Sequence, residues 1–181
     1  MKKTVMSKSS LRTRQIAVCG LLTALSVVFT WFGAVTDVLD LTMLMLSSFC
    51  IVFAVIEMGN RWAWLIWAVT AVLSLLLLPN KLAAVLYLMG GMYPIAKAAF
   101  EKLHPAVSWI LKLSAFNTIQ LFFLLIAQKI FGMTGADYSF AAGPILFNNL
   151  VFFVYDITLT VFITFYLVKL RRRLKIKSFR D

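Results

Sequence analysis

The chain consists of long apolar runs separated by short polar segments. Six runs are close to or above the length of about 20 residues that a helix needs to cross a bilayer. The runs are Ile16–Phe32, Leu41–Ile56, Trp62–Leu78, Leu82–Ala99, Val107–Phe131 and Ile145–Leu170. Charged residues and turn formers gather between them. This pattern predicts an all-α, polytopic membrane protein with six transmembrane helices.

Composition supports a membrane location. Hydrophobic residues make up 62% of the 181 residues, which is more than a soluble domain can hide in one core. Six spans also leave no room for a separate soluble domain. We therefore predict one integral membrane domain over residues 1–181, with a basic tail at residues 1–14 and another at residues 171–181.

The basic residues are distributed unevenly around the predicted spans. With six spans, sixteen of the 18 Lys and Arg residues fall on one side of the bilayer, and only Lys81 and Lys129 fall on the other. Because short loops rich in Lys and Arg are hard to translocate, the basic side is predicted to be the cytoplasm, with both termini inside a cell membrane. The net charge of +11 then faces the anionic inner leaflet, so we expect the bilayer, and not nucleic acid, as its partner.

The first run also has features of a secretory signal peptide, since basic residues precede an apolar stretch. Ile16–Ala34 is longer than the usual apolar region of about 7–15 residues, however. Phe32 also occupies the −3 position of the only plausible cleavage site, where a small residue is required. We expect this segment to be retained as a membrane span.

Several kinds of chemistry have no support in the sequence. Cys19 and Cys50 lie inside spans without a nearby histidine, so neither a metal site nor a disulfide is expected. His104, the only histidine, lies in a predicted cytoplasmic loop, where a solvated side chain is the expectation. No P-loop, GxSxG or HExxH motif occurs. We predict no enzyme activity and no cofactor, because the spans show no acid–base or nucleophile pair.

Polar residues inside the last two spans are the candidate functional residues. Asp156 lies near the middle of the last span, and Asn149 shares its helix face, with Asn148 a little to one side. A carboxyl group at that depth must be neutral, paired or hydrated, which favours a function for Asp156. In the fifth span Asn117, Thr118 and Gln120 could face the same strip. Amide pairing between helices is also a common structural device, so both roles are open for the amides.

Charged residues near the span ends have simpler interpretations. Lys97 and Glu101 are one helical turn apart and could pair, but we interpret them as solvated anchors at the cytoplasmic end. Glu57 is similarly placed to pair with Arg61. On the outer side a further group ends or begins adjacent spans and could line a pocket, although interface anchoring explains its aromatic members equally well. The group is Trp31, Asp37, Asp40, Asn80, Lys81 and Tyr87.

The first span carries a stripe of small residues, Ala17, Gly20 and Ala24. Small residues four positions apart allow another helix to approach closely. The stripe could aid packing within the bundle, or it could be a docking face for a partner subunit.

Together these features resemble the substrate-binding S component of energy-coupling factor (ECF) transporters. The resemblance covers nearly the whole chain and rests on its size, the six spans with both ends inside, and two short segments. These are the basic Arg12-Thr-Arg14 leading into a small-residue helix that ends Ala24-Leu-Ser-Val-Val28, and the turn Gly59-Asn-Arg-Trp62. The stretch from Pro79 through Lys97, with Asn149–Asp156 later in the chain, is also similar to a group of small bacterial membrane proteins.

The resemblance implies a mechanism. An S component captures a vitamin or similar small molecule from outside and delivers it by toppling, in a complex with a T subunit and two ATPase subunits. Its first helix contacts the T subunit through an Ala-xxx-Ala motif, which Gly20 and Ala24 match with Gly in the first position. The link between the first two spans would act as a lid. Ligand contacts would come from Tyr87, Gln120, Asn148 and Asn149, with Asp156 deeper.

An alternative of another class is a non-transporting scaffold of cell-envelope assembly, similar to the rod-shape protein MreD. Such a scaffold has comparable length, charge and span count. A ligand carrier needs polar side chains that converge on an outer pocket, whereas a scaffold can keep its spans uniformly apolar. The polar residues that favour the carrier are Asn117, Gln120, Asn148, Asn149 and Asp156.

Overall fold

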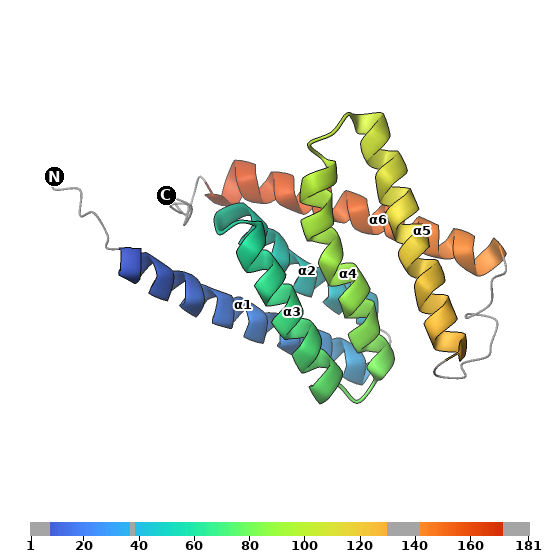
Figure 1. Ribbon diagram of the computed structural model, residues 1–181, viewed down its shortest axis with the longest axis horizontal. Helices are drawn as coiled ribbons and strands as arrows, with labels where there is room; N and C mark the ends of the chain where they lie inside the picture. The colour runs from blue at the N-terminus through green and yellow to red at the C-terminus, as the bar shows by residue number, and fades with distance from the viewer. Residues whose placement is uncertain (1–7, 37–38, 130–141, 172–181) are drawn as a thin grey trace. The chain divides into compact units, whose positions relative to one another are not determined.

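The computed structural model describes residues 8–36, 39–129 and 142–171 (Figure 1). Within these ranges the chain is all-helical and contains no strand, which confirms the predicted fold class. The helices are α1 (Lys8–Thr36), α2 (Asp40–Glu57), α3 (Asn60–Leu77), α4 (Lys81–Phe100), α5 (Pro105–Lys129) and α6 (Ala142–Phe165), and a π-helical segment, Tyr166–Leu170, continues α6.

Five of these helices are long and apolar enough to cross a bilayer. The spans are Arg12–Thr36, Asp40–Glu57, Asn60–Leu77, Ala83–Phe100 and Ile145–Lys169. α5 has 25 residues and therefore also the length of a span. The structure thus supports a multi-pass membrane protein with five to six spanning helices. The cytoplasmic placement of both termini stays a prediction.

Some predicted features lie outside the described residues. They are most of the two basic tails (residues 1–7 and 172–181), the position of Asp37 in the proposed lid, and the outer loop over residues 130–141.

The helix ends follow local backbone chemistry. Gly59 has a positive φ of 94°, a region that favours glycine, and it reverses the chain between α2 and α3. Pro105 occupies the first position of α5, where its missing N–H costs no helical hydrogen bond. α4 continues through Pro94. A Cβ added at Gly90 of α4 would lie 2.8 Å from a methyl carbon of Leu44 in α2, so the glycine permits a close approach of the two helices.

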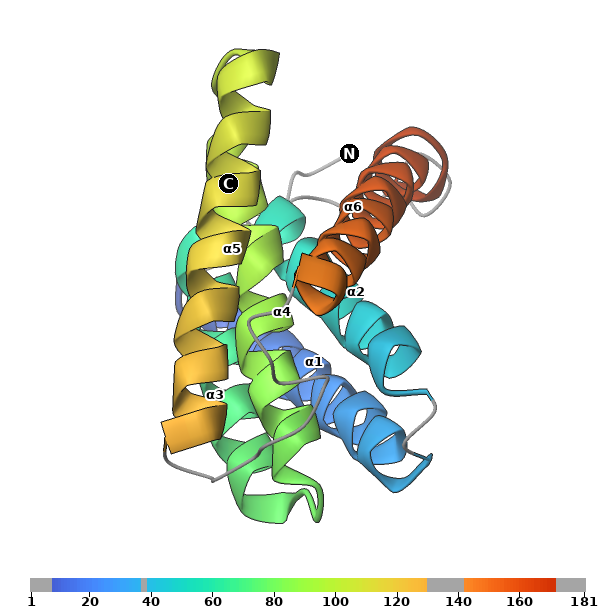
Figure 2. The same ribbon diagram turned by 90° about the vertical axis from the view of Figure 1, so that its right-hand side faces the viewer.

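The chain divides into two compact units, which are described separately. The first comprises Met1–Ala96 with Ile163–Asp181, and the second comprises Lys97–Phe162. In the first unit α1 packs against α2 and α3, and α2 packs against α3 (Figures 1 and 2). The main core of this unit is formed by Leu44, Ile51, Ala54, Met58, Ala63, Ile66, Ala71, Tyr87 and Ile95.

The second unit is built around the crossing of α5 and α6. Phe116 stacks on Phe152 with ring centroids 4.3 Å apart, and Trp109 packs on Phe153 at 5.5 Å. These contacts place the polar residues of α5 next to those of α6. The last residues of α4, Lys97–Phe100, belong to the same unit.

Candidate functional site

The second unit holds a cluster of four charged side chains contributed by three helices and one turn. Lys97 lies in the last turn of α4, Lys112 lies two turns into α5, and Asp156 lies in α6. Glu101 lies in the turn that joins α4 to α5. We call these four residues the charge cluster.

Lys97 uses all three of its ammonium protons within the unit. Its Nζ atom donates to the Asp156 carboxylate and, at 2.8 Å, to the hydroxyl of Thr160. It also pairs with Oε1 of Glu101 at 2.8 Å. Thr160 in turn donates to the backbone oxygen of Asp156, which fixes the hydroxyl as an acceptor for the lysine.

Lys112 makes longer contacts with the same two carboxylates. Its Nζ atom lies 3.2 and 3.3 Å from the two oxygens of Asp156 and 3.3 Å from Oε1 of Glu101. The ammonium also lies 5.2 Å from the centre of the Trp109 ring, within the range of a cation–π interaction. One carboxylate oxygen of Glu101 and one of Asp156 therefore bridge the two lysines.

Burial separates Glu101 from the other three members. The side chains of Lys97, Lys112 and Asp156 are 1%, 5% and 3% exposed, whereas that of Glu101 is 40% exposed. Two buried ammonium groups and one buried carboxylate leave one positive charge in excess. Because an uncompensated charge at this depth costs several kcal/mol, Glu101 is needed to balance the cluster.

The interpretation of Lys97 as a solvated anchor is therefore wrong. The side chain turns back into the unit because Asp156 and Thr160 of α6 offer it acceptors there. Lys112 is a further member of the site that was not predicted from the sequence, where it belongs to the cations assigned to the cytoplasmic side. The sequence did contain a signal for Lys112. A carboxylate inside a span, such as Asp156, requires a cation at similar depth.

A second buried carboxylate, Glu57, lies in the first unit. It is fully buried, and its Oε1 atom accepts a hydrogen bond of 3.1 Å from the Tyr166 hydroxyl and pairs with Nε of Arg171 at 3.3 Å. Arg61, the predicted partner, is exposed and does not contact it. Local spacing suggested Arg61, whereas packing brings the end of the last helix to Glu57.

The amide candidates form one reciprocal pair. Asn117 and Asn149 exchange two hydrogen bonds of 3.0 Å between α5 and α6, so Asn117 faces the strip as predicted. Thr118 is exposed instead and bonds the backbone of Ser114. Gln120 is buried, and neither atom of its amide has a hydrogen-bond partner among the described residues. Asn148 is half-buried.

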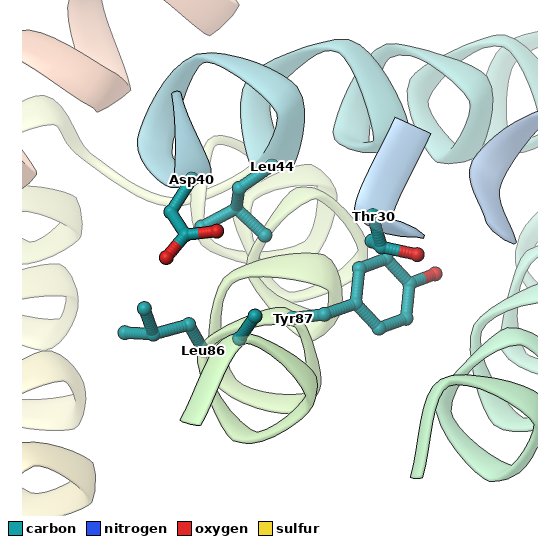
Figure 3. Close-up of a pocket in the computed structure, with 6 residues that line it drawn as sticks. Thr30, Asp40, Leu44, Leu86 and Tyr87 are labelled. Atoms are coloured by element: carbon teal, nitrogen blue, oxygen red, sulfur yellow. The ribbon is translucent and has the colours of Figure 1, made fainter. Parts of the chain in front are cut away.

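The remaining ligand candidate, Tyr87, lies in the first unit and lines a small cavity. Thr30 from α1, Asp40 and Leu44 from α2, and Ala83 and Leu86 from α4 complete the lining. The Tyr87 ring extends toward Thr30, while the Asp40 carboxylate lies beyond Leu44 (Figure 3). The cavity volume of about 10 Å³ is the space of one water molecule. Of the group predicted to line an outer pocket, Asp40 and Tyr87 line this cavity, whereas Trp31 and Asn80 do not. That the cavity opens to the outside stays a prediction.

The small-residue stripe lies on the exposed surface of α1. Ala17, Gly20 and Ala24 are all exposed, and a Cβ added at Gly20 would meet no atom within 4 Å. Packing within the bundle, one of the two readings of this stripe, is therefore not found among the described residues. The stripe is available to another helix.

Cys19 and Cys50 are free thiols. Among the residues that the structure describes, no three His, Cys, Asp or Glu side chains lie close enough together to hold a metal ion.

The fold and these sites define a multi-pass helical membrane protein with a buried charge cluster. Comparisons with protein-family models, with curated proteins and with solved structures find no match to this chain.

Proposed function

We propose that this chain is the substrate-binding membrane subunit of an ECF-type uptake transporter. It captures a vitamin or similar small molecule from outside and works with a separate T subunit and two ATPase subunits. The chain itself carries out no catalysis. The observation that carries the proposal is the exposed, smooth stripe of Ala17, Gly20 and Ala24 on α1.

The stripe supports docking because of where it lies and what surrounds it. Small residues let two helix backbones approach closely, and the resulting van der Waals packing is one of the forces that associate helices in a bilayer. Farther along the helix, the exposed side chains of Val28, Trp31 and Val35 are large. The smooth surface is thus confined to the half of α1 that follows Arg12 and Arg14. In S components this is the half that contacts the T subunit.

The cavity beside Tyr87 supports a ligand site at the other end of α1. Thr30 and Asp40 stand on the two sides of the link between α1 and α2, the segment proposed to act as a lid. A vitamin is far larger than the present cavity. We therefore propose that the cavity enlarges before a ligand can reach Tyr87.

In this proposal each polar residue of the second unit would contribute to ligand binding in a different way. Asn149 is engaged by Asn117, so a ligand would have to exchange with that pair. Gln120 has a buried amide that a ligand could satisfy. Asp156 would act through Lys97 and Lys112, the residues that hold its carboxylate. Asn148 stays a candidate contact.

The docking test uses two matched glycines. Gly20 and Gly143 both lie in helices, are both exposed, and have no atom within 4 Å of an added Cβ. Tagged wild type, Gly20→Leu and Gly143→Leu are purified from the native host, and bound proteins are identified by mass spectrometry. We expect wild type and Gly143→Leu to retain a T subunit and ATPases, and Gly20→Leu to lose at least nine-tenths of them. An intact complex with Gly20→Leu would contradict docking through the stripe.

A scaffold of the MreD type is the second candidate. It is favoured by the mutual pairing of Asn117 with Asn149, and of Asp156 with two lysines, because these side chains then need no ligand. Recovery of cell-wall synthesis proteins in place of transporter subunits in the same purification would support the scaffold.

A further inference from the structure

The charge cluster has one member that can leave it. Glu101 lies in a turn and not within a helix, and its side chain is 40% exposed. If the Glu101 side chain turns outward from this position, its carboxylate is solvated by water and needs no new protein partner. The three buried members cannot leave without losing their partners, because each is at least 95% shielded from solvent.

Departure of Glu101 would leave the buried part with a net positive charge. Lys97 would lose the Glu101 oxygen, at 2.8 Å, and Lys112 would keep only its two contacts with the Asp156 carboxylate. Two ammonium groups that share one carboxylate repel each other in a medium of low dielectric constant. The position of the Glu101 carboxylate is therefore a place where any oxyanion would be stabilised.

Lys112 is the lysine better suited to accept a new partner. Its three contacts with carboxylate oxygens measure 3.2 to 3.3 Å, longer than the roughly 2.7–2.9 Å of a well-formed charge-assisted hydrogen bond. Its ammonium is thus held loosely against the face of Trp109. A shorter bond to an incoming oxyanion would be a gain for Lys112, whereas Lys97 already has close partners.

We propose that Lys97 and Lys112 form a binding site for an oxyanion, a carboxylate or phosphate group, and that Glu101 occupies this site in the present structure. The bound group takes the place of the Glu101 carboxylate between the two lysines, with Asp156 as the fixed counter-ion behind them. Lys102, the residue after Glu101, is exposed and adds a further positive charge to this turn. The source of the oxyanion is either a free solute or the head group of an anionic lipid. The proposal does not depend on the chain being a transporter.

The test removes the internal carboxylate and supplies an external one. Thermal unfolding of wild type and Glu101→Gln is followed in a neutral detergent, with sodium phosphate exchanged for sodium chloride at constant ionic strength. We expect saturating phosphate to raise the midpoint of Glu101→Gln by several degrees and that of wild type by less than half as much. Glu101→Asp, which keeps the charge on a shorter side chain, should respond like wild type.

Two controls separate the site from general salt effects. Glu57→Gln removes a buried carboxylate from the first unit and should gain nothing from phosphate beyond the wild-type response. Adding Lys112→Met to Glu101→Gln should abolish the phosphate effect. Equal responses of wild type, Glu101→Gln and Glu57→Gln, or a phosphate effect that survives Lys112→Met, would overturn the proposal. Tryptophan fluorescence provides a second reading, because phosphate binding should alter the signal of Glu101→Gln and the alteration should vanish with Trp109→Phe.

A further pair of measurements distinguishes the two sources. Glu101→Gln is placed in nanodiscs of phosphatidylcholine with and without phosphatidylglycerol, in buffer free of phosphate. Stabilisation by phosphatidylglycerol that is lost with Lys112→Met indicates a lipid head group. Stabilisation by inorganic phosphate alone indicates a soluble anion. If neither source stabilises Glu101→Gln, the charge cluster is a closed structural network and the proposal is wrong.

Discussion

Replacing Asp156 with asparagine is expected to be among the most damaging conservative changes in this chain. The substitution keeps the size of the side chain but removes the charge that faces two buried lysines. Glu101 alone would then have to balance Lys97 and Lys112, and one positive charge would stay uncompensated. An asparagine NH₂ group can only donate, so a side chain oriented with that group toward either ammonium adds a further repulsive contact.

The size of this effect follows from the burial of the pair. Removing one partner of a buried ion pair typically costs about 3–5 kcal/mol. Water can reach the cluster through Glu101, which favours the lower end of that range. At about 2–4 °C per kcal/mol for a chain of this length, the midpoint of thermal unfolding should fall by roughly 6–12 °C.

The assay compares thermal unfolding of detergent-solubilised variants that differ by one charge. Glu101→Gln makes the same chemical change at the exposed member of the cluster and should lower the midpoint less than Asp156→Asn does, because water can solvate the cluster at the position of the 40% exposed Glu101 side chain. Adding Lys112→Met to Asp156→Asn removes the excess charge and should recover part of the loss. An Asp156→Asn midpoint within about one degree of wild type, or a double variant less stable than Asp156→Asn, would refute the assignment of a charged, paired Asp156.

Two other predictions concern topology and helix packing. Tags at both termini and a reporter near Arg61 should be cytoplasmic, whereas a reporter near Asp137, which lies outside the described residues, should be external. An external C-terminus in this accessibility assay would refute the model of six spans with both termini inside. Gly90→Ala should destabilise the protein by about 1–3 kcal/mol, because its Cβ would lie 2.8 Å from Leu44 and crowd a packed contact. Gly20→Ala, which meets no atom within 4 Å, should cost nothing in the same thermal unfolding measurement, and equal midpoints for the two variants would contradict the close approach of α2 and α4.

The sequence by itself determined the helices and their membrane location. In a bilayer the backbone N–H and C=O groups of a lone apolar segment must form their hydrogen bonds within that segment. A long apolar run therefore forms a helix. The same limits on burial identified Asp156, because an isolated carboxylate cannot be tolerated inside a span. Helical spacing also placed Asn149 on one face with Asp156, and the amide of Asn117 does meet Asn149 there.

Only the tertiary structure decided which charges meet. Lys97 and Glu101 do pair as their spacing suggested, but Asp156, 59 residues from Lys97, could not be assigned from sequence. Glu57 similarly accepts a hydrogen bond from Tyr166, 109 residues away, and does not pair with the nearby Arg61. The physical reason is the reach of a lysine near a helix end. Its long apolar stem allows the ammonium to extend toward water or back into the protein, and the acceptors on α6, Asp156 and Thr160, decide between these alternatives.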